Sequence, residues 1–156
     1  MAVRVSSNDF DISAEMAKLS AGDTAIGGVA LFVGKVRGSS RGQPLVSMTL
    51  EHYPGMTEAE LERIEAEARA RFRLSGSLIV HRVGELKPGD NIVLVIACAS
   101  HRQDAFAGAE YLMDYLKTRA PFWKKETLAD GSAVWVEARE CDEDAAAAWG
   151  SKSDRP

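Results

Sequence analysis

Short strand-like runs and helix-like segments interleave along this 156-residue chain, and their order limits the folds that it can adopt. Runs rich in β-branched and aromatic residues predict strands at 25–34, 45–53, 77–85 and 91–99. Helical segments lie between some of these runs but not between all of them. Because the regular alternation of βαβ units is missing, the sequence predicts an α+β fold with mixed or antiparallel sheets.

Turn-forming residues indicate how the strands are connected. Lys87-Pro88-Gly89-Asp90 separates the last two strands named above, and its Pro-Gly pair favours a tight turn. Asp130-Gly131 separates strand-like runs at 122–128 and 133–138, which predicts a C-terminal β-hairpin. The chain has no internal repeat and no linker-like stretch, so we expect residues 1–156 to form one domain.

Capping signals predict where the helices begin. Thr57 and Glu60 form a T-x-x-E capping box at the start of the first helix. Ser100, followed by Gln103, gives a second signal at the start of another helix. The tail at 141–149 is rich in acidic residues and then in alanine, which is typical of a short terminal helix.

Periodicity predicts which faces of these elements are buried. In the strand at 45–53, alternation places Val46, Met48, Leu50 and His52 on one face. The helices have apolar faces formed by Leu61, Ile64, Ala68 and Phe72, and by Phe106, Ala109, Met113 and Leu116. The first helix is expected to expose a charged face of Glu58, Glu62, Glu65, Arg69 and Arg73.

Composition argues against several classes of protein. A net charge of -4 at pH 7 and a pI of about 5.4 argue against a dedicated nucleic-acid binder. No apolar run approaches the roughly 18 residues of a membrane span, and the first residues lack the apolar stretch of a secretory signal. We therefore expect a cytoplasmic protein that binds neither nucleic acid nor membrane.

The cysteines and histidines are dispersed along the chain. Cys98 and Cys141 have no C-x-x-C spacing, and Cys98 lies in an apolar run where burial is expected. His52, His81 and His101 lie on separate elements without the spacing of a zinc site. The sequence therefore predicts no metal site, no disulfide framework and no bound cofactor.

Charge segregation is the strongest indication of a ligand site. The stretch between Asp23 and Glu51 contains no acidic residue, and neither does 115–125. These windows and the start of the second helix carry the basic residues Lys35, Arg37, Arg41, His101, Arg102, Lys117, Arg119, Lys124 and Lys125. Clusters of cations at loops and helix ends favour an anionic ligand.

The predicted second helix separates two of these basic clusters. His101 and Arg102 lie at its start and Lys117 near its end, and about sixteen residues of helix span roughly 24 Å. One small ligand cannot contact both ends of the same helix. Either the clusters contact different parts of a large ligand, or they meet in one pocket across a dimer interface.

Ordinary structural roles would also account for each cluster. His101 and Arg102 fit a pair that solvates the first turn of a helix, and Lys117 fits a cation that complements the helix dipole. Lys124 and Lys125 beside Trp123 resemble a nucleic-acid patch, which the acidic composition disfavours.

Several unusual motifs occur in order along the chain. Together they resemble the large, catalytic subunit of the molybdopterin synthase family, and the resemblance extends from about residue 23 to 149. The motifs are GKVR at 34–37, LEHYPGM at 50–56, HRVGEL at 81–86, SHR at 100–102 and MDYLKTRAPFWKKE at 113–126.

The resemblance implies a fold, an activity and partners. It implies a dimeric, α/β-hammerhead-like fold and a sulfurtransferase that converts cyclic pyranopterin monophosphate (precursor Z) into molybdopterin by inserting two sulfurs. It also implies a small ubiquitin-like partner that delivers sulfur as a thiocarboxylate on its C-terminal Gly-Gly. The expected assembly is a heterotetramer around a homodimer of the large subunit.

The resemblance further implies the site residues. Lys117 and Lys124 match the family's essential lysines, with Lys117 expected to transfer protons and Lys124 to stabilise an oxyanion. Arg139 matches an arginine donated by the neighbouring protomer, which favours the dimer explanation above. The matched substrate-binding positions are Lys35, Val36, Arg37, His101, Arg102, Lys117, Lys124, Lys125, Glu126 and Arg139.

Two other functions remain compatible with the sequence. A non-catalytic module that binds phosphate or nucleotide would use the same basic pocket, and a scaffold would hold the ubiquitin-like subunit without catalysing a reaction. Sulfur transfer would identify the sulfurtransferase, ligand binding without transfer the binding module, and assembly with the partner alone the scaffold.

Overall fold

Two β-sheets form the centre of the fold. The computed structural model describes residues 2–136 and 140–151. In the first sheet β1 runs parallel to β5, and the other neighbours are antiparallel. Its strand order is β1 (Val3–Ser6), β5 (Gly76–Arg82), β7 (Asn91–Ala99) and β2 (Gly28–Lys35).

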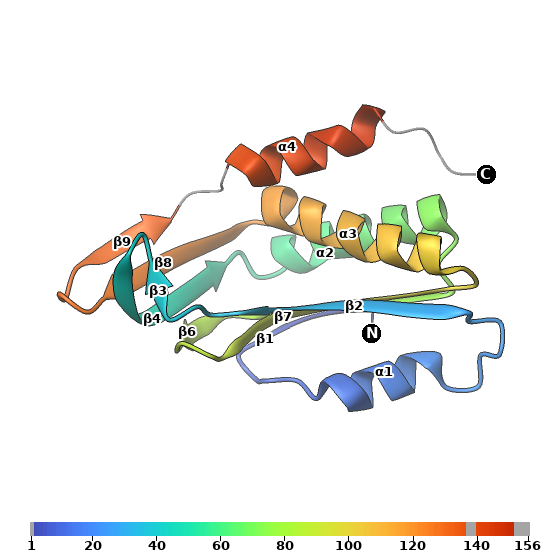
Figure 1. Ribbon diagram of the computed structural model, residues 1–156, viewed down its shortest axis with the longest axis horizontal. Coiled ribbons are helices and arrows are strands. Elements are labelled where there is room, and N and C mark those ends of the chain that lie inside the picture. The colour runs from blue at the N-terminus through green and yellow to red at the C-terminus, as the bar shows by residue number, and fades with distance from the viewer. Residues whose placement is uncertain (1, 137–139, 152–156) are drawn as a thin grey trace.

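The second sheet is antiparallel and lies at one end of the first (Figure 1). A short strand, β6 (Gly84–Leu86), pairs with β4 and follows directly after β5 in the chain, so it connects the two sheets. The remaining strand order is β3 (Ser39–Ser40), β4 (Gln43–His52), β8 (Phe122–Leu128) and β9 (Ala133–Val136).

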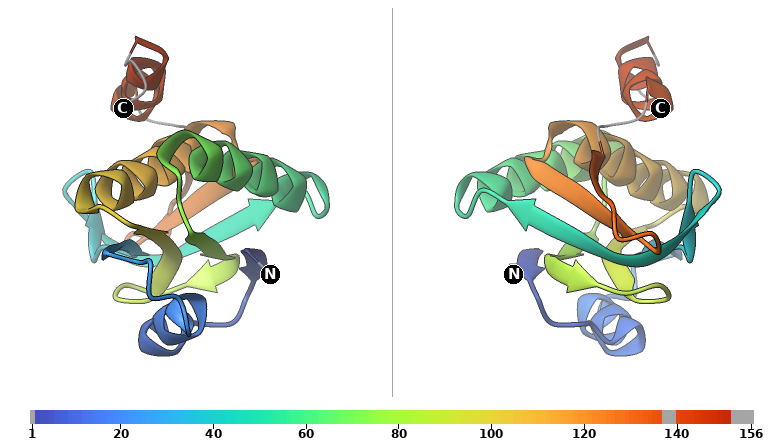
Figure 2. Two further views of the ribbon diagram at one scale, coloured as in Figure 1. Left: turned by 90° about the vertical axis from the view of Figure 1, so that its right-hand side faces the viewer. Right: turned by 90° about the vertical axis from the view of Figure 1, so that its left-hand side faces the viewer.

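Helices cover both faces of the first sheet (Figures 1 and 2). α2 (Met56–Phe72) and α3 (Arg102–Arg119) pack side by side on one face, and α1 (Ile12–Ser20) lies on the other. α4 (Glu140–Ala148) packs on α3 and continues into a 3-10 turn, Trp149–Ser151. The Trp149 indole donates to the Asp114 carboxylate at 2.7 Å, which fixes this end of α4 on α3.

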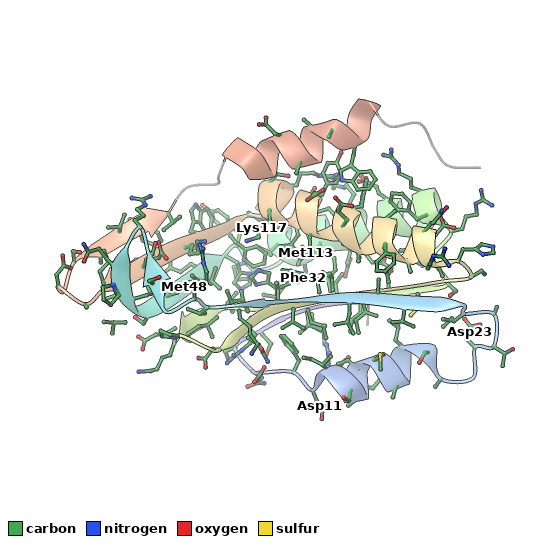
Figure 3. All side chains as sticks on the ribbon, in the orientation of Figure 1. Asp11, Asp23, Phe32, Met48, Met113 and Lys117 are labelled. Atoms are coloured by element: carbon green, nitrogen blue, oxygen red, sulfur yellow. The ribbon has the colours of Figure 1, made fainter. Side chains whose placement is uncertain are left out.

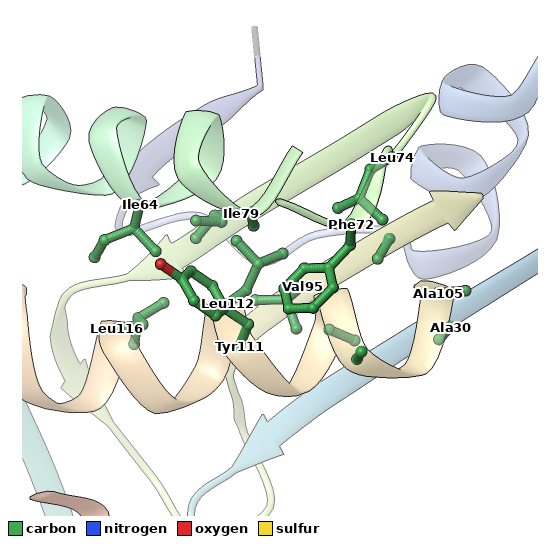
Figure 4. Packing of buried hydrophobic residues seen from close by; sticks show 14 of the residues in the cluster. Ala30, Ile64, Phe72, Leu74, Ile79, Val95, Ala105, Tyr111, Leu112 and Leu116 are labelled. Atoms are coloured by element: carbon green, nitrogen blue, oxygen red, sulfur yellow. The ribbon is translucent and has the colours of Figure 1, made fainter. Parts of the chain in front are cut away.

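β7 is buried on both faces, as its unbroken apolar sequence requires. Val95 and Ala97 face α2 and α3 in a core that includes Ile64 and Leu112 (Figure 4). The alternate residues Leu94, Ile96 and Cys98 face α1 together with Leu78 and Val80. Every residue from Val93 to Ala99 is at most 3% exposed, so β7 contributes to two cores at once.

The α+β prediction is confirmed. The run predicted as one strand at 77–85 divides into β5, which pairs antiparallel with β7, and β6 in the second sheet; the C-terminal hairpin turns through Asp130-Gly131 as expected. Gly131 has a φ of 88°, a conformation that glycine adopts without strain.

Both predicted helix starts are wrong by one or two residues. The N-cap of α2 is Gly55, whose N–H donates to the Glu58 carboxylate, and Thr57 instead lies buried with its hydroxyl donating to the Tyr53 carbonyl at 2.8 Å. Gly55 has a φ of 86°, which allows an early turn into the helix. α3 begins after His101 rather than Ser100.

Two apolar residues lie on the opposite face from the one predicted. Val46 is 50% exposed because a β-bulge between Leu45 and Ser47 changes which residues point inward. Phe106 is 66% exposed because the buried stripe of α3 passes through Ala105 and its helical neighbours instead. Met48 and Leu50 are buried as predicted.

Glu65 was expected on the solvated face of α2 but is buried. Its carboxylate accepts hydrogen bonds from the Ser77 hydroxyl and, at 2.7 Å, from the Arg69 guanidinium. These partners compensate the loss of hydration, since a buried carboxylate needs hydrogen-bond donors and a counter-charge.

The segment before β2 passes very close to the start of α3. The Gly27 N–H donates to the Ala99 carbonyl at 2.9 Å, and a Cβ at Gly27 would lie 1.9 Å from the Ser100 carbonyl oxygen. A side chain at this position therefore forces the backbone apart.

We expect Gly27→Ala to lower the free energy of unfolding by about 3 kcal/mol, as overpacking does in well-packed interiors. Gly38→Ala is the matched control because a Cβ there has no atom within 4 Å. Urea denaturation measures both variants. Equal stability of the two variants would contradict the close approach.

Candidate functional site

A pocket of about 760 Å³ opens where the end of β2, the end of α3 and the second sheet converge. Figure 3 shows Lys117, Met113 and Phe32 in this region, below the C-terminal end of α3. Apolar side chains from both sheets and from α3 form much of the wall. They include Phe32, Met48, Leu50, Met113, Leu116 and Phe122.

The wall also carries five cationic side chains. Lys35 and Arg37 come from the end of β2 and the residues after it, Arg41 from the β3–β4 turn, Lys117 from the last turn of α3, and Lys124 from β8. Cations from the two acid-free windows of the sequence therefore line one pocket. A wall of this composition favours a ligand that combines an anionic group with an apolar or planar part.

Glu126 is the carboxylate among the described residues that line this pocket. It is 8% exposed and accepts a hydrogen bond from the Ser40 hydroxyl at 2.8 Å. This bond connects β3 to β8, which are separated by β4 in the second sheet. The Lys35 ammonium donates to the Gly89 carbonyl at 3.3 Å, which connects the end of β2 to the turn between β6 and β7.

Ion pairs to α2 fix the last turn of α3. Arg119 donates to Glu60 at 2.8 Å and to Glu67 at 2.7 Å, and these carboxylates raise the pKa of Arg119 above its ordinary value. Lys117, two residues earlier, lies in the pocket wall instead. The acids of α2 therefore engage the arginine of this turn and leave the lysine facing the pocket.

His81 belongs to the pocket wall and was missed as a candidate. The imidazole stacks on the Phe122 ring at 3.8 Å between centroids, with 18° between the planes, and its Nδ1 lies 2.8 Å from the Arg82 carbonyl oxygen. Burial, helped by the charges of Lys117 and His52, lowers the pKa of His81 to about 4, although the hydrogen bond with the Arg82 carbonyl acts in the opposite direction. The available signal was an imidazole that directly follows the apolar run Leu78–Val80 of a buried strand.

Other predicted site residues lie outside this pocket wall. Val36 is 3% exposed and packs beside Leu45, with its N–H bonded to the Asp90 carbonyl. Lys125 places its ammonium 5.7 Å from the centre of the Trp135 ring. His101 and Arg102 are exposed at the opposite end of α3 from Lys117, and Arg139 lies outside the described residues.

Comparison with known proteins identifies the family. The sequence profile described as MoaE protein matches residues 5–119, which is most of the chain. This chain belongs to the MoaE protein family. The molybdopterin synthase catalytic subunit of Mesorhizobium japonicum is 52% identical to it over 97% of this chain and 95% of the relative.

Solved structures of the MoaE family share the fold. The molybdopterin biosynthesis MoaE protein of Burkholderia ambifaria superimposes with a TM-score of 0.81 at 54% identity, covering 96% of this chain and 99% of that one. Molybdopterin synthase from Staphylococcus aureus gives a TM-score of 0.79 at 28% identity, covering 85% and 95%. The resemblance inferred from the motifs is thereby confirmed.

In this MoaE-family chain the Cys98 thiol is not placed for catalysis. It is buried against α1, and burial raises its pKa, with the Asp23 charge adding to the effect. Within the described ranges, His, Cys, Asp and Glu side chains form no cluster of three that could bind a metal ion. Nor does any helix there combine the length and apolarity needed to cross a bilayer.

Burial of neutral His81 predicts a pH dependence of stability. The folded-state pKa of about 4 lies below the ordinary value of 6.5, so the unfolded chain binds a proton first as the pH falls. We expect this residue alone to reduce the free energy of unfolding by about 2 kcal/mol between pH 7 and pH 5.

His81→Phe keeps a planar ring against Phe122 and removes this titration. Urea unfolding at pH 7 and pH 5 should therefore show a smaller decrease for the variant than for the wild type. An identical decrease in both proteins would mean that His81 is not held neutral by the fold.

Proposed function

We propose that this chain is the catalytic subunit of a molybdopterin synthase. It transfers sulfur from the C-terminal thiocarboxylate of a small ubiquitin-like partner to cyclic pyranopterin monophosphate, which produces the dithiolene of molybdopterin. The observation that carries the proposal is the placement of Lys117 and Lys124 in one pocket, with Arg37 and Lys35 at its rim. Membership in the MoaE family supports the same reaction.

The pocket suits a reaction in which the nucleophile comes from the partner. The thiocarboxylate sulfur attacks a carbon of the pterin precursor, and the carbon–oxygen bond at that carbon breaks so that its oxygen leaves as water or as a phosphate oxygen. The product is a thioester that joins substrate and partner. Water then attacks the acyl carbon, and collapse of the tetrahedral intermediate leaves sulfur on the substrate and a carboxylate on the partner. No thiol of this chain takes part, which agrees with the burial of Cys98.

The two lysines have different roles in this scheme. Lys117, at the exposed end of α3, transfers protons as sulfur attacks and the acyl group leaves. Lys124, half-buried on β8, stabilises the oxyanion of the tetrahedral intermediate. Arg37 and Lys35 bind the cyclic phosphate by charge-assisted hydrogen bonds. The scheme requires no metal and no organic cofactor.

We further propose that two copies of this chain form the centre of a heterotetramer. β2 lies at the edge of the first sheet, and the apolar side chains of Val29, Leu31 and Phe106 are exposed on β2 and α3. Pairing through this surface would cover them. It would bring His101 and Arg102 of one protomer toward the pocket of its partner, with Arg139 as the third donated cation.

The remaining proposals concern the whole chain. We propose that residues 1–156 act as one domain, that the substrate-binding set also includes Val36, Lys125 and Glu126, and that the protein acts in the cytoplasm. Val36 would contribute by supporting the rim from the core, since its side chain is buried.

Lys117→Ala should reduce molybdopterin formation by at least about 100-fold, because the general acid-base group is lost. The assay mixes the purified chain, thiocarboxylated partner and precursor Z and measures dithiolene product. Lys18→Ala on α1, an exposed lysine across the sheet from the pocket, is the matched control and should retain activity.

The same assay separates the alternatives. Near-normal turnover in Lys117→Ala would refute the role of this lysine. If the wild type binds the precursor but transfers no sulfur, a phosphate-binding module is favoured. If it assembles with the partner but neither binds the precursor nor transfers sulfur, a scaffold is favoured.

Lys124→Ala should reduce kcat by about 100-fold or more, as loss of an oxyanion donor does. Because hydrolysis of the acyl adduct is the step affected, the covalent adduct of partner and substrate should accumulate and be visible by intact-mass spectrometry. Unchanged kcat with an unaltered pH-rate profile would contradict the oxyanion role.

A further inference from the structure

One buried titratable group in the pocket has no role in the reaction described above. His81 is 4% exposed, yet it forms part of the same wall as Lys117 and Lys124. We propose that His81 is a positioning residue: when the Lys117 side chain turns into the pocket, its ammonium donates a hydrogen bond to the Nε2 lone pair of His81, which orients the ammonium toward the reacting carbonyl. This inference rests on the proposed role of Lys117.

The surroundings of the imidazole determine its tautomer. The Arg82 carbonyl oxygen, 2.8 Å from Nδ1, can only accept a hydrogen bond, so Nδ1 carries the proton. In a neutral imidazole Nε2 is then an acceptor. The Phe122 ring stacked at 3.8 Å prevents the imidazole from turning away from this orientation.

The charged groups around the imidazole are mostly cations, so a neutral hydrogen-bond acceptor at this point is favourable. Lys117 approaches from α3 and Lys124 lies in the same wall on β8, while His52 approaches from β4 with its own partner, Glu58, at 3.7 Å. The register neighbours of His81 on β1 and β7 are Val5 and Val93, which carry no charge. Protonation of His81 would add another cation to this wall. Burial of the imidazole disfavours the protonated form and so keeps Nε2 available as an acceptor.

An ammonium group has three protons to donate and no lone pair. At the end of a long flexible side chain it requires fixed acceptors if it is to stay in one orientation. The stacked imidazole of His81, which lines the same pocket as Lys117, supplies one such acceptor.

The experiment compares His81→Phe, which keeps a ring but removes the acceptor, with His81→Gln, which keeps an acceptor. His81→Phe should lower kcat by roughly 10- to 100-fold with little change in KM, because Lys117 is misplaced rather than lost. His81→Gln should recover part of that loss. His52→Phe is the matched control and should retain kcat, because His52 also lies beside the Phe122 ring but does not line the pocket.

Nitrogen-15 NMR of the imidazole tests the contact without turnover. At pH 7 the wild type should show protonated Nδ1 and unprotonated Nε2, and Lys117→Met should shift the Nε2 resonance. A protonated Nε2, or a resonance indifferent to Lys117→Met, would overturn the proposal, as would full kcat in His81→Phe. Absence of sulfur transfer by the wild type would instead refute the proposed function, since the Nε2 shift is measured without substrate.

Discussion

Burial of β7 on both faces is the constraint on which the rest of this structure depends. Alternate residues of β7 pack against α2 and α3 on one side and against α1 on the other. The strand also pairs with β2 and β5, and it leads into α3 after only two residues. The end of β2, the histidine of β5 and the axis of α3 are therefore all positioned by one apolar strand, and these three elements contribute Lys35, His81 and Lys117 to the pocket.

Charge is distributed so that an acidic protein has a basic pocket. The acids of α2 are engaged away from the pocket, where Glu60 and Glu67 bind Arg119 and Glu65 binds Arg69 and Ser77. Repulsion among the pocket cations is reduced by Glu126 and by exposure of Lys35, Arg37 and Lys117 to solvent. An anionic substrate would relieve the remaining repulsion. The clustered cations therefore destabilise the folded protein slightly when no ligand is bound, and the same cations favour binding of an anion.

Sequence periodicity predicted the element types well because most strands and helices here bury one face against a continuous core. Periodicity failed where one residue shifts the pattern of buried positions. A bulge exposes Val46, Gly55 starts α2 early, and the buried stripe of α3 passes through Ala105 and so leaves Phe106 exposed. For the site, the sequence indicated three cationic clusters for one anionic ligand; Lys35, Arg37, Lys117 and Lys124 from two of them line one pocket, whereas His101 and Arg102 lie at the other end of α3. His81 was missed because its value depends on the stacking of Phe122, a contact between distant strands that no local pattern encodes.

The reaction proposed for this chain moves sulfur from a partner's C-terminus to a pterin bound at Lys117 and Lys124. The most direct measurement uses partner protein whose thiocarboxylate carries sulfur-34, mixed with the wild-type chain and precursor Z, with the product analysed by mass spectrometry. The proposed mechanism predicts molybdopterin in which both dithiolene sulfurs carry the label. Product without label, or no product while the precursor remains bound, would contradict it.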